Sequence, residues 1–290
     1  MTQFLPISLP FSLEHTLYSG QAFRWREHEG WHYGIVGGNL VKIRQTKQGL
    51  EWESSPAPAA QLTSAIHSYF RLGDDLDEVY RHIGRDSRIR EAIARYRGMH
   101  LIEQDPWECL VAFLCSINSN IPRITDLLGL LSRKLGQSIT LGDVTLYAFP
   151  MPEDLASLGE SGLRRLGLGF RASYIDIVAN AVARGELNLA SLKELPYEQA
   201  KAGLMMLRGI GDKVADCVLL FSLGKLEAFP IDRWVRRAVQ EWYFNGAKLS
   251  DRAIHQWALD YFGPYAGYAQ QYLFYSRRSF GKGRAALAEP

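Results

Sequence analysis

A glycine turn and a lysine that could do chemistry lie together in residues 207–232, LRGIGDKVADCVLLFSLGKLEAFPID. Gly209 and Gly211 separate two helical patterns, and Lys213 falls in the first turn of the second helix. Two glycines one residue apart let backbone N–H groups approach a phosphate closely, and the helix dipole favours an anion there. The pattern therefore predicts a phosphate-binding hairpin between helices, although a GxG turn alone is more often a simple tight connection.

Lys213 is the candidate nucleophile of this segment. A neutral lysine amine can attack an electrophilic carbon and remain bound to it as a Schiff base. A positive charge opposes the dipole at a helix N-terminus, so this position is locally unfavourable and suggests a use. The alternative is a solvated lysine paired with Asp216 three residues later, and the segment taken alone favours that alternative.

Asp232 ends the segment as the predicted N-cap of a helix over 233–243. An aspartate in this position is commonly only a structural cap. A carboxylate held by backbone amides can also stabilise a positive charge that develops beside it. Both roles are compatible, so Asp232 is a second candidate for the chemistry.

Two kinds of element must position these residues. Short runs with strand character between Phe23 and Glu53, broken at glycines, predict an antiparallel meander, and helical spacing dominates from Leu62 onward. Asp105 and Glu108 flank Pro106 in a capping-box arrangement that predicts a helix through about Cys115. A polar loop follows at 116–120, and helical segments are predicted from Pro122 and over 152–158, 160–166, 172–184 and 196–206. We predict an α+β architecture with an antiparallel sheet domain over 1–97 and a helical domain over 98–290.

Composition narrows the class of protein. The chain has 290 residues, of which 47% are hydrophobic, but no apolar run is long enough for a membrane span and the N-terminus lacks a signal-peptide pattern. Three cysteines without CxxC spacing indicate neither a disulfide framework nor a zinc or iron–sulfur site. The net charge of +2 hides an asymmetry, because residues 201–290 hold 13 Lys and Arg against 8 Asp and Glu. We expect a cytoplasmic, monomeric protein.

Five segments in order carry a resemblance that covers most of the chain: YSGQAFRWRE at 18–27, DPWECLVAFLCSINSNIPRIT at 105–125, LGLGFRASY at 166–174, the hairpin segment with VADC, and YAGYAQQYLFYS at 265–276. Together they resemble the helix–hairpin–helix glycosylase superfamily, and in particular its 8-oxoguanine DNA glycosylase/lyase branch. The resemblance implies a partner, double-stranded DNA that contains 8-oxoguanine. It also implies a reaction in which the damaged base is flipped out of the duplex and excised. Cleavage of the strand by β-elimination then follows.

The resemblance assigns the reaction to two residues. Lys213 attacks C1′, expels the base and holds the sugar as a Schiff base, while Asp232 stabilises the cationic transition state. Three residues of the hairpin, through their backbone, bind DNA phosphate: Gly209, Gly211 and Val214. Catalysis needs no metal or cofactor, although a monovalent or alkaline-earth cation can bind carbonyls near Leu207 and Ile210.

The resemblance also assigns base recognition. The Gly20 carbonyl accepts a hydrogen bond from N7–H of 8-oxoguanine, whereas guanine presents an acceptor at N7 and is repelled. Cys217 and Phe274 sandwich the flipped base, and Gln270 reads its Watson–Crick edge. The residues that bind the stranded cytosine or wedge into the opened stack are Asn118, Arg123, Arg171 and Phe170.

This sequence departs from the family pattern at four positions. Arg208 replaces a usual proline, Ser119 an asparagine, Phe170 a tyrosine and Trp234 a frequent histidine. Trp234 removes a polar contact beside Asp232, which leaves the strength of the lyase step open. Two other functions stay open, a sister glycosylase for another damaged base and a non-catalytic DNA-binding module.

Overall fold

The sheet of the protein has five antiparallel strands. The computed structural model describes residues 2–7 and 10–286, with side chains to residue 278. Its strands are β1 (Gln3–Pro6), β2 (Arg26–His28), β3 (Trp31–Val36), β4 (Asn39–Gln45) and β5 (Gly49–Ser55). They lie in the order β1-β5-β4-β3-β2. The predicted meander is confirmed as β2 to β5, whereas the short edge strand β1 was not predicted.

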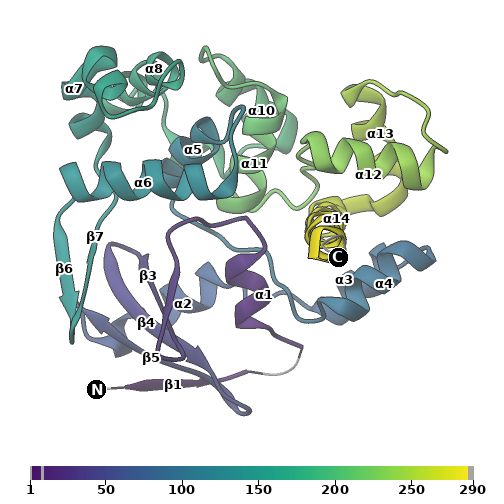
Figure 1. Ribbon diagram of the computed structural model, residues 1–290, viewed down its shortest axis with the longest axis horizontal. Helices are drawn as coiled ribbons and strands as arrows, with labels where there is room; N and C mark the ends of the chain where they lie inside the picture. The colour runs from purple at the N-terminus through teal and green to yellow at the C-terminus, as the bar shows by residue number, and fades with distance from the viewer. Residues whose placement is uncertain (1, 8–9, 287–290) are drawn as a thin grey trace.

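Different elements cover the two faces of the sheet, helices on one face and a hairpin on the other (Figure 1). Val41, Ile43 and Trp52 are buried on one face, in one cluster with residues of α1 (Leu13–Tyr18) and α2 (Thr63–Tyr69). The opposite face carries Tyr33 and Leu40, which pack against a hairpin of two strands, β6 (Ser138–Leu141) and β7 (Val144–Tyr147). The sheet thus packs on both faces, and on one of them it contacts α1, the helix that precedes the Gly20 turn.

The helical part forms the larger core. Its helices are α3 (Leu76–Ile83), α4 (Ser87–Arg95), α5 (Pro106–Cys115), α6 (Ile121–Leu135), α7 (Pro152–Arg165), α8 (Arg171–Ala183), α9 (Leu189–Leu192), α10 (Tyr197–Met205), α11 (Asp212–Ser222), α12 (Arg233–Tyr243), α13 (Asp251–Phe262) and α14 (Ala266–Ala286). Two short 3-10 turns, η1 (Ala59–Leu62) and η2 (Gly263–Tyr265), precede α2 and α14. The predicted α+β fold is confirmed. None of the helices in the described ranges is long and apolar enough to cross a membrane.

The predicted helices agree with the structure within about two residues. The two segments predicted over 152–158 and 160–166 form one helix, α7, broken by the non-helical Gly159. The predicted domain boundary at residue 97 remains a prediction. Buried residues of α3 and α4, such as Leu76 and Ile89, belong to the same core cluster as α5 and α11, so these two helices pack with the helical part.

A buried arginine ties the sheet domain to the helical domain. Arg24 Nε and Nη2 donate to the two carboxylate oxygens of Glu108, each at 2.6 Å, and Nη1 donates to Ser132 Oγ and the Tyr147 carbonyl. Asp105 caps α5 as predicted, accepting from the Glu108 amide at 2.9 Å. The reciprocal half of the predicted capping box is wrong, because the Glu108 carboxylate binds Arg24 instead.

Candidate active site

The predicted hairpin joins α10 to α11. Gly209 has a φ of +100°, and a Cβ there would lie 2.4 Å from Tyr174 Cγ, so both backbone conformation and packing require glycine. Gly211 is the N-cap of α11 and provides no side-chain cap. The first helical hydrogen bond of α11 runs from the Ala215 amide to the Gly211 carbonyl. The amides before Ala215, including that of Val214, therefore have no helical acceptor and can bind an anion.

Lys213 turns inward from this hairpin. Its Nζ donates to Ser116 Oγ at 2.7 Å and lies 4.9 Å from the centre of the Phe113 ring. The alternative pairing with Asp216 is wrong, because Asp216 is buried and pairs with Lys201 at 3.0 Å. The half-buried amine is thus held between α11 and the loop after α5, and among the described side chains no carboxylate forms an ion pair with it.

Asp232 caps α12, as predicted. One carboxylate oxygen, Oδ1, accepts hydrogen bonds from the Trp234 and Val235 amides, both at 2.8 Å. These two bonds fix the carboxylate group at the start of α12. Trp234, at the departure from the family pattern, therefore meets Asp232 through its backbone amide.

Cys217 lies near both Lys213 and Asp232. The side chain is 3% exposed, and burial raises the pKa of its thiol to about 12. Lys213 opposes this rise in the pKa of Cys217, and Asp216 and Asp232 add to it. Lys213, Cys217 and Asp232 are therefore brought together, as the sequence predicts.

Gly20, the residue predicted to recognise N7–H, lies in the turn after α1. Gly20 has a φ of +94°, which disfavours any residue with a Cβ. The buried Gln21 side chain fixes this turn, donating to the Thr16 and His100 carbonyls at 3.0 and 2.8 Å. Gln271 of α14 donates to the Ser19 carbonyl at 3.1 Å, so the turn and α14 are held together.

One face of α14 packs against the Gly20 turn. A Cβ on Gly20 would lie 3.2 Å from Phe274 Cε1 and 2.7 Å from Arg278 Nη1. Gln270, one helical turn before Phe274, is 4% exposed, and its Oε1 is buried without a hydrogen-bond partner. The structure therefore brings Phe274 and Arg278 against the Gly20 turn, with Gln270 one helical turn before Phe274 on the same helix. The sequence analysis did not identify Arg278.

The residues predicted to meet the opposite strand gather where the 116–120 loop meets the start of α8. Arg171 Nε donates to the Ile117 carbonyl and Nη2 to the Asn118 carbonyl, both at 2.9 Å. Its guanidinium lies 4.6 Å from the ring centre of Phe170, which is 43% exposed. Arg123 Nη2 donates to the Gly167 carbonyl at 2.9 Å. The four predicted residues thus form one rim, with Phe170 as its exposed ring.

Ser116 is a second residue that the sequence analysis treated only as part of a polar loop. Its hydroxyl donates to the Phe113 carbonyl at 2.6 Å and accepts from Lys213 Nζ. Because the proton of the hydroxyl is directed to a carbonyl, its lone pairs face the amine. The contact fixes where the nucleophile lies before substrate binds.

We expect Ser116→Ala to slow base excision about three- to tenfold, the effect of one neutral hydrogen bond. Borohydride trapping should persist, because Lys213 remains. Ser119→Ala is the matched control, since the Ser119 hydroxyl in the same loop is buried without a partner. Single-turnover excision rates compare the two variants, and equal rates for both would show that the Ser116 contact does not position the amine.

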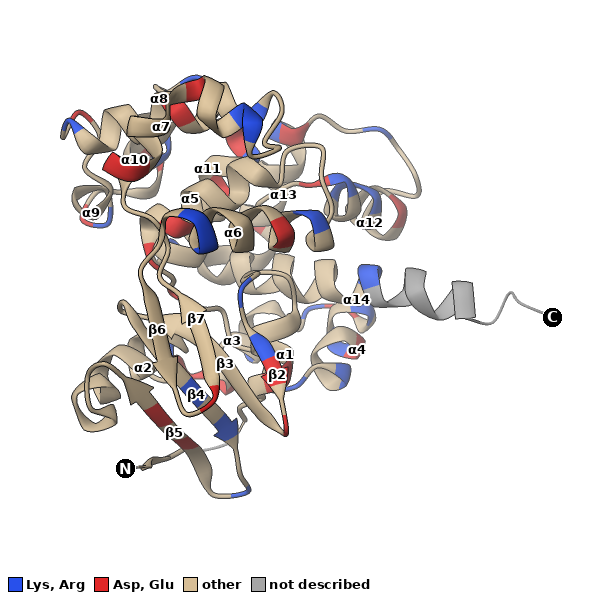
Figure 2. Cartoon of the chain, turned by 60° about the vertical axis from the view of Figure 1, so that its left-hand side comes forward, with Lys and Arg blue, Asp and Glu red and all other residues tan. Residues whose placement is uncertain are grey.

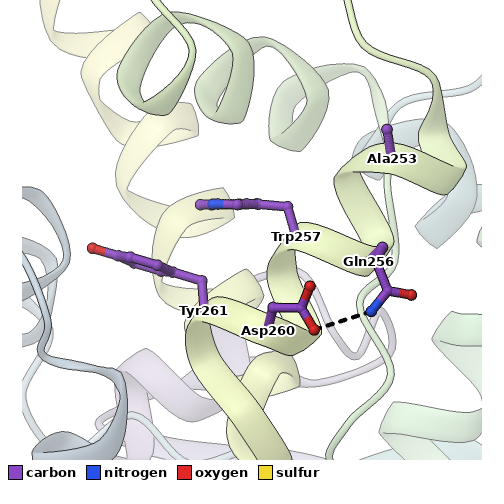
Figure 3. Close-up of a pocket in the computed structure, with 5 residues that line it drawn as sticks. All are labelled: Ala253, Gln256, Trp257, Asp260 and Tyr261. Carbon is purple, nitrogen blue, oxygen red and sulfur yellow. Dashed lines mark hydrogen bonds between the residues drawn. The ribbon is translucent and has the colours of Figure 1, made fainter.

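A shallow pocket elsewhere is not this site. Figure 3 shows its lining residues on one helix, α13: Ala253, Gln256, Trp257, Asp260 and Tyr261. None of the predicted site residues lines it. Within the described ranges, no three His, Cys, Asp or Glu side chains gather in a way that could hold a metal ion.

Comparison with known proteins identifies the family. Residues 5–110 match the family "8-oxoguanine DNA glycosylase, N-terminal domain", and residues 111–262 match "HhH-GPD superfamily base excision DNA repair protein". The chain is 33% identical to the N-glycosylase/DNA lyase OGG1 of Arabidopsis thaliana, over 93% of this chain and 80% of that relative. It is 30% identical to a probable N-glycosylase/DNA lyase of Methanothermobacter thermautotrophicus, over 93% and 94% of the two chains.

Two solved structures share the whole architecture. MBOgg1 in complex with a low-affinity DNA ligand is 33% identical, with a TM-score of 0.89 over 96% of this chain and 99% of that one. The 8-oxoguanine glycosylase/lyase of Clostridium acetobutylicum, bound to double-stranded DNA with cytosine opposite 8-oxoG, is 31% identical. It matches with a TM-score of 0.88 over 93% of each chain. The chain therefore belongs to the HhH-GPD superfamily of base excision DNA repair proteins and carries the N-terminal domain of its 8-oxoguanine DNA glycosylases.

Proposed function

We propose that this chain is a bifunctional DNA glycosylase/AP lyase that excises 8-oxoguanine opposite cytosine and then cleaves the strand. The observation that carries the proposal is the half-buried amine of Lys213, held beside the uncapped N-terminus of α11 and facing the same thiol as Asp232. A phosphate bound by the helix amides would place the sugar of the flipped nucleotide near this amine. The named activities of the relatives support the same reaction.

In the proposed reaction the neutral Nζ of Lys213 attacks C1′ of the damaged nucleotide. The bond from C1′ to the base breaks, and the base leaves with the electron pair and takes up a proton. After the attack the nitrogen loses one proton, and its lone pair then breaks the C1′–O4′ bond. The ring opens, O4′ takes up a proton, and a protonated Schiff base between Nζ and C1′ remains. Loss of a C2′ proton then expels the 3′ phosphate by β-elimination. The Asp232 carboxylate lowers the barrier by stabilising the positive charge that develops on the sugar.

We propose that residues of α11, α14 and the Gly20 turn together bind the flipped base and select its oxidised form. Within the described part of the chain, no group donates to the Gly20 carbonyl, so this acceptor is available to the N7–H that guanine lacks. Phe274 and Cys217 would cover the two faces of the base, and Gln270 would bind its Watson–Crick edge. The unpaired Gln270 Oε1 supports this role, since a buried acceptor without a donor costs free energy.

The rim formed by Asn118, Arg123, Phe170 and Arg171 is proposed to hold the opened duplex. Phe170 is the exposed apolar ring that can enter the base stack, and the two arginines can donate to the stranded cytosine. Figure 2 shows Lys and Arg residues, in blue, along α12. These basic residues would add sequence-independent attraction for the DNA backbone. Their contribution should weaken as salt concentration rises.

We propose that the reaction needs no cofactor and takes place in the cytoplasm, at the nucleoid in a bacterium. A monovalent or alkaline-earth cation on the carbonyls of Leu207 and Ile210 would serve only to hold the hairpin. The Leu207 carbonyl accepts one hydrogen bond, from the Ile210 amide at 3.2 Å, so one lone pair remains for such an ion.

The proposal is tested by incision of duplexes that differ only in the lesion and in the opposite base. We expect cleavage of duplexes with 8-oxoguanine opposite cytosine, and much slower cleavage opposite adenine, because the rim donors match the cytosine edge. Preference for an alkylated base would instead identify a sister glycosylase. Binding without incision of any lesion would identify a non-catalytic module.

Gly20→Ala should impair recognition of the lesion more than recognition of an abasic site. The new Cβ would meet Arg278 Nη1 at 2.7 Å and Phe274 Cε1 at 3.2 Å in a backbone conformation that alanine rarely adopts. Displacement of the Gly20 carbonyl should weaken binding to the lesion duplex about tenfold or more. Binding to a duplex with an abasic-site analogue should barely change, and equal losses on both duplexes would reduce Gly20 to a structural role.

A further inference from the structure

Arg278 brings a guanidinium group to the turn that carries Gly20. Its Nη1 would lie 2.7 Å from a Cβ on Gly20, and its Cζ lies 5.9 Å from the centre of the Phe274 ring. Arg278 therefore brings a charged side chain against Gly20, the residue proposed to read the lesion. Arg278 lies outside the five segments that carry the family resemblance.

The Nη1 nitrogen of Arg278 is buried and has no hydrogen-bond partner. A guanidinium is a donor only, and leaving a buried donor unpaired costs free energy. Burial lowers the pKa of Arg278 from its ordinary value, while Tyr275 opposes that shift. The buried Arg24, by contrast, is paired with Glu108. The unpaired nitrogen thus indicates an acceptor that arrives with the substrate.

A second unpaired polar atom lies on the same face of α14. Gln270, Phe274 and Arg278 are spaced four residues apart, so their side chains follow one stripe of the helix. Gln270 Oε1 is a buried acceptor without a donor, and Arg278 Nη1 is a buried donor without an acceptor. An aromatic ring with an unpaired polar atom at each end suits a flat heterocycle that has hydrogen-bonding groups on two edges.

We propose that Arg278 donates a hydrogen bond from Nη1 to O8 of the flipped base, so that it reads the oxidised edge jointly with the Gly20 carbonyl. This inference rests on the proposed function. In 8-oxoguanine the N7–H donor and the C8=O acceptor are neighbours, and they match the carbonyl of Gly20 and the N–H of Arg278. Guanine carries an acceptor at N7 and a C–H at C8, so it satisfies neither partner in this arrangement. The substrate class is a purine whose five-membered ring holds N–H beside C=O.

The test compares two substrates for Arg278→Met. One is a duplex with 8-oxoguanine opposite cytosine, and the other carries a preformed abasic site, which offers no base to read. We expect base excision to slow about tenfold or more, the effect of losing a charge-assisted hydrogen bond. Strand cleavage at the abasic site should stay within about twofold, because Lys213 and the hairpin are unchanged.

Two further variants control for charge and folding. Arg277→Met removes the neighbouring arginine, which pairs with Glu241 at 2.6 Å outside the pocket, and both activities should stay near wild type. Arg278→Lys keeps the charge without the planar fork and should fall between Arg278→Met and wild type on 8-oxoguanine. Melting temperatures of all three variants identify any that fail to fold, and in that case Arg278→Lys decides the outcome.

The outcomes separate this inference from the proposed function. A wild-type enzyme that does not excise 8-oxoguanine contradicts the function itself. If the wild type excises it and Arg278→Met does so at an equal or higher rate, the contact with O8 is overturned. Equal losses of Arg278→Met on both substrates would also overturn it, because they would show that Arg278 only supports the fold.

Discussion

Lys213→Gln is expected to abolish both the release of 8-oxoguanine and the formation of a borohydride-trapped adduct. Glutamine has no nucleophilic amine, so the covalent route is lost and base release should fall by about 10⁴-fold or more. The amide can still bind Ser116, and the α11 amides that face phosphate are unchanged. Specific binding to a lesion duplex should therefore survive, as an electrophoretic mobility assay would show.

Lys248→Gln is the control for this variant, because Lys248 is an exposed lysine outside the site. It should retain wild-type trapping. A trapped adduct on the Lys213→Gln variant would remove Lys213 from the role of nucleophile. Loss of both chemistry and binding would point instead to a damaged hairpin.

Asp232→Asn should slow base excision about 10²- to 10³-fold while the protein stays folded. Asparagine caps a helix as well as aspartate, so the bonds to the Trp234 and Val235 amides can be kept. The change removes the negative charge that stabilises the cationic sugar. Loss of one electrostatic contact to a transition state typically lowers the rate by about this factor. Single-turnover excision and thermal melting measure the two effects separately.

Asp75→Asn provides a matched control for the cap. Asp75 caps α3 and accepts from the Asp77 and Glu78 amides in the same way, at an exposed position outside the site. Its substitution should leave excision unchanged. If Asp232→Asn also excises at the wild-type rate, Asp232 is a structural cap and another group must stabilise the transition state.

The features that the sequence predicted well are set by local physics. Glycines at the hairpin and capping aspartates at 105 and 232 act within one helical turn, and the structure has helix starts at both caps. The antiparallel meander is likewise visible in short runs between glycine turns. Local patterns of this kind survive folding because few tertiary contacts compete with them.

The contacts that were missed join residues far apart in the chain. Ser116 meets Lys213 across 97 positions, and Arg278 reaches Gly20 only because α14 packs on the turn after α1. Glu108 has the sequence context of a capping residue, but its carboxylate accepts hydrogen bonds from the buried Arg24 of the sheet domain. Pairings of this kind depend on tertiary packing, which a local pattern cannot specify.

The central claim, that Lys213 forms the covalent intermediate, is tested most directly on the unmodified chain. The enzyme would be incubated with a duplex that holds 8-oxoguanine opposite cytosine, reduced with borohydride and digested with protease. Mass spectrometry of the cross-linked peptide then locates the adduct. We predict that the sugar remnant is attached to Nζ of Lys213. An adduct on another amine, such as Lys201, or excision that proceeds with no adduct at all, would contradict the account.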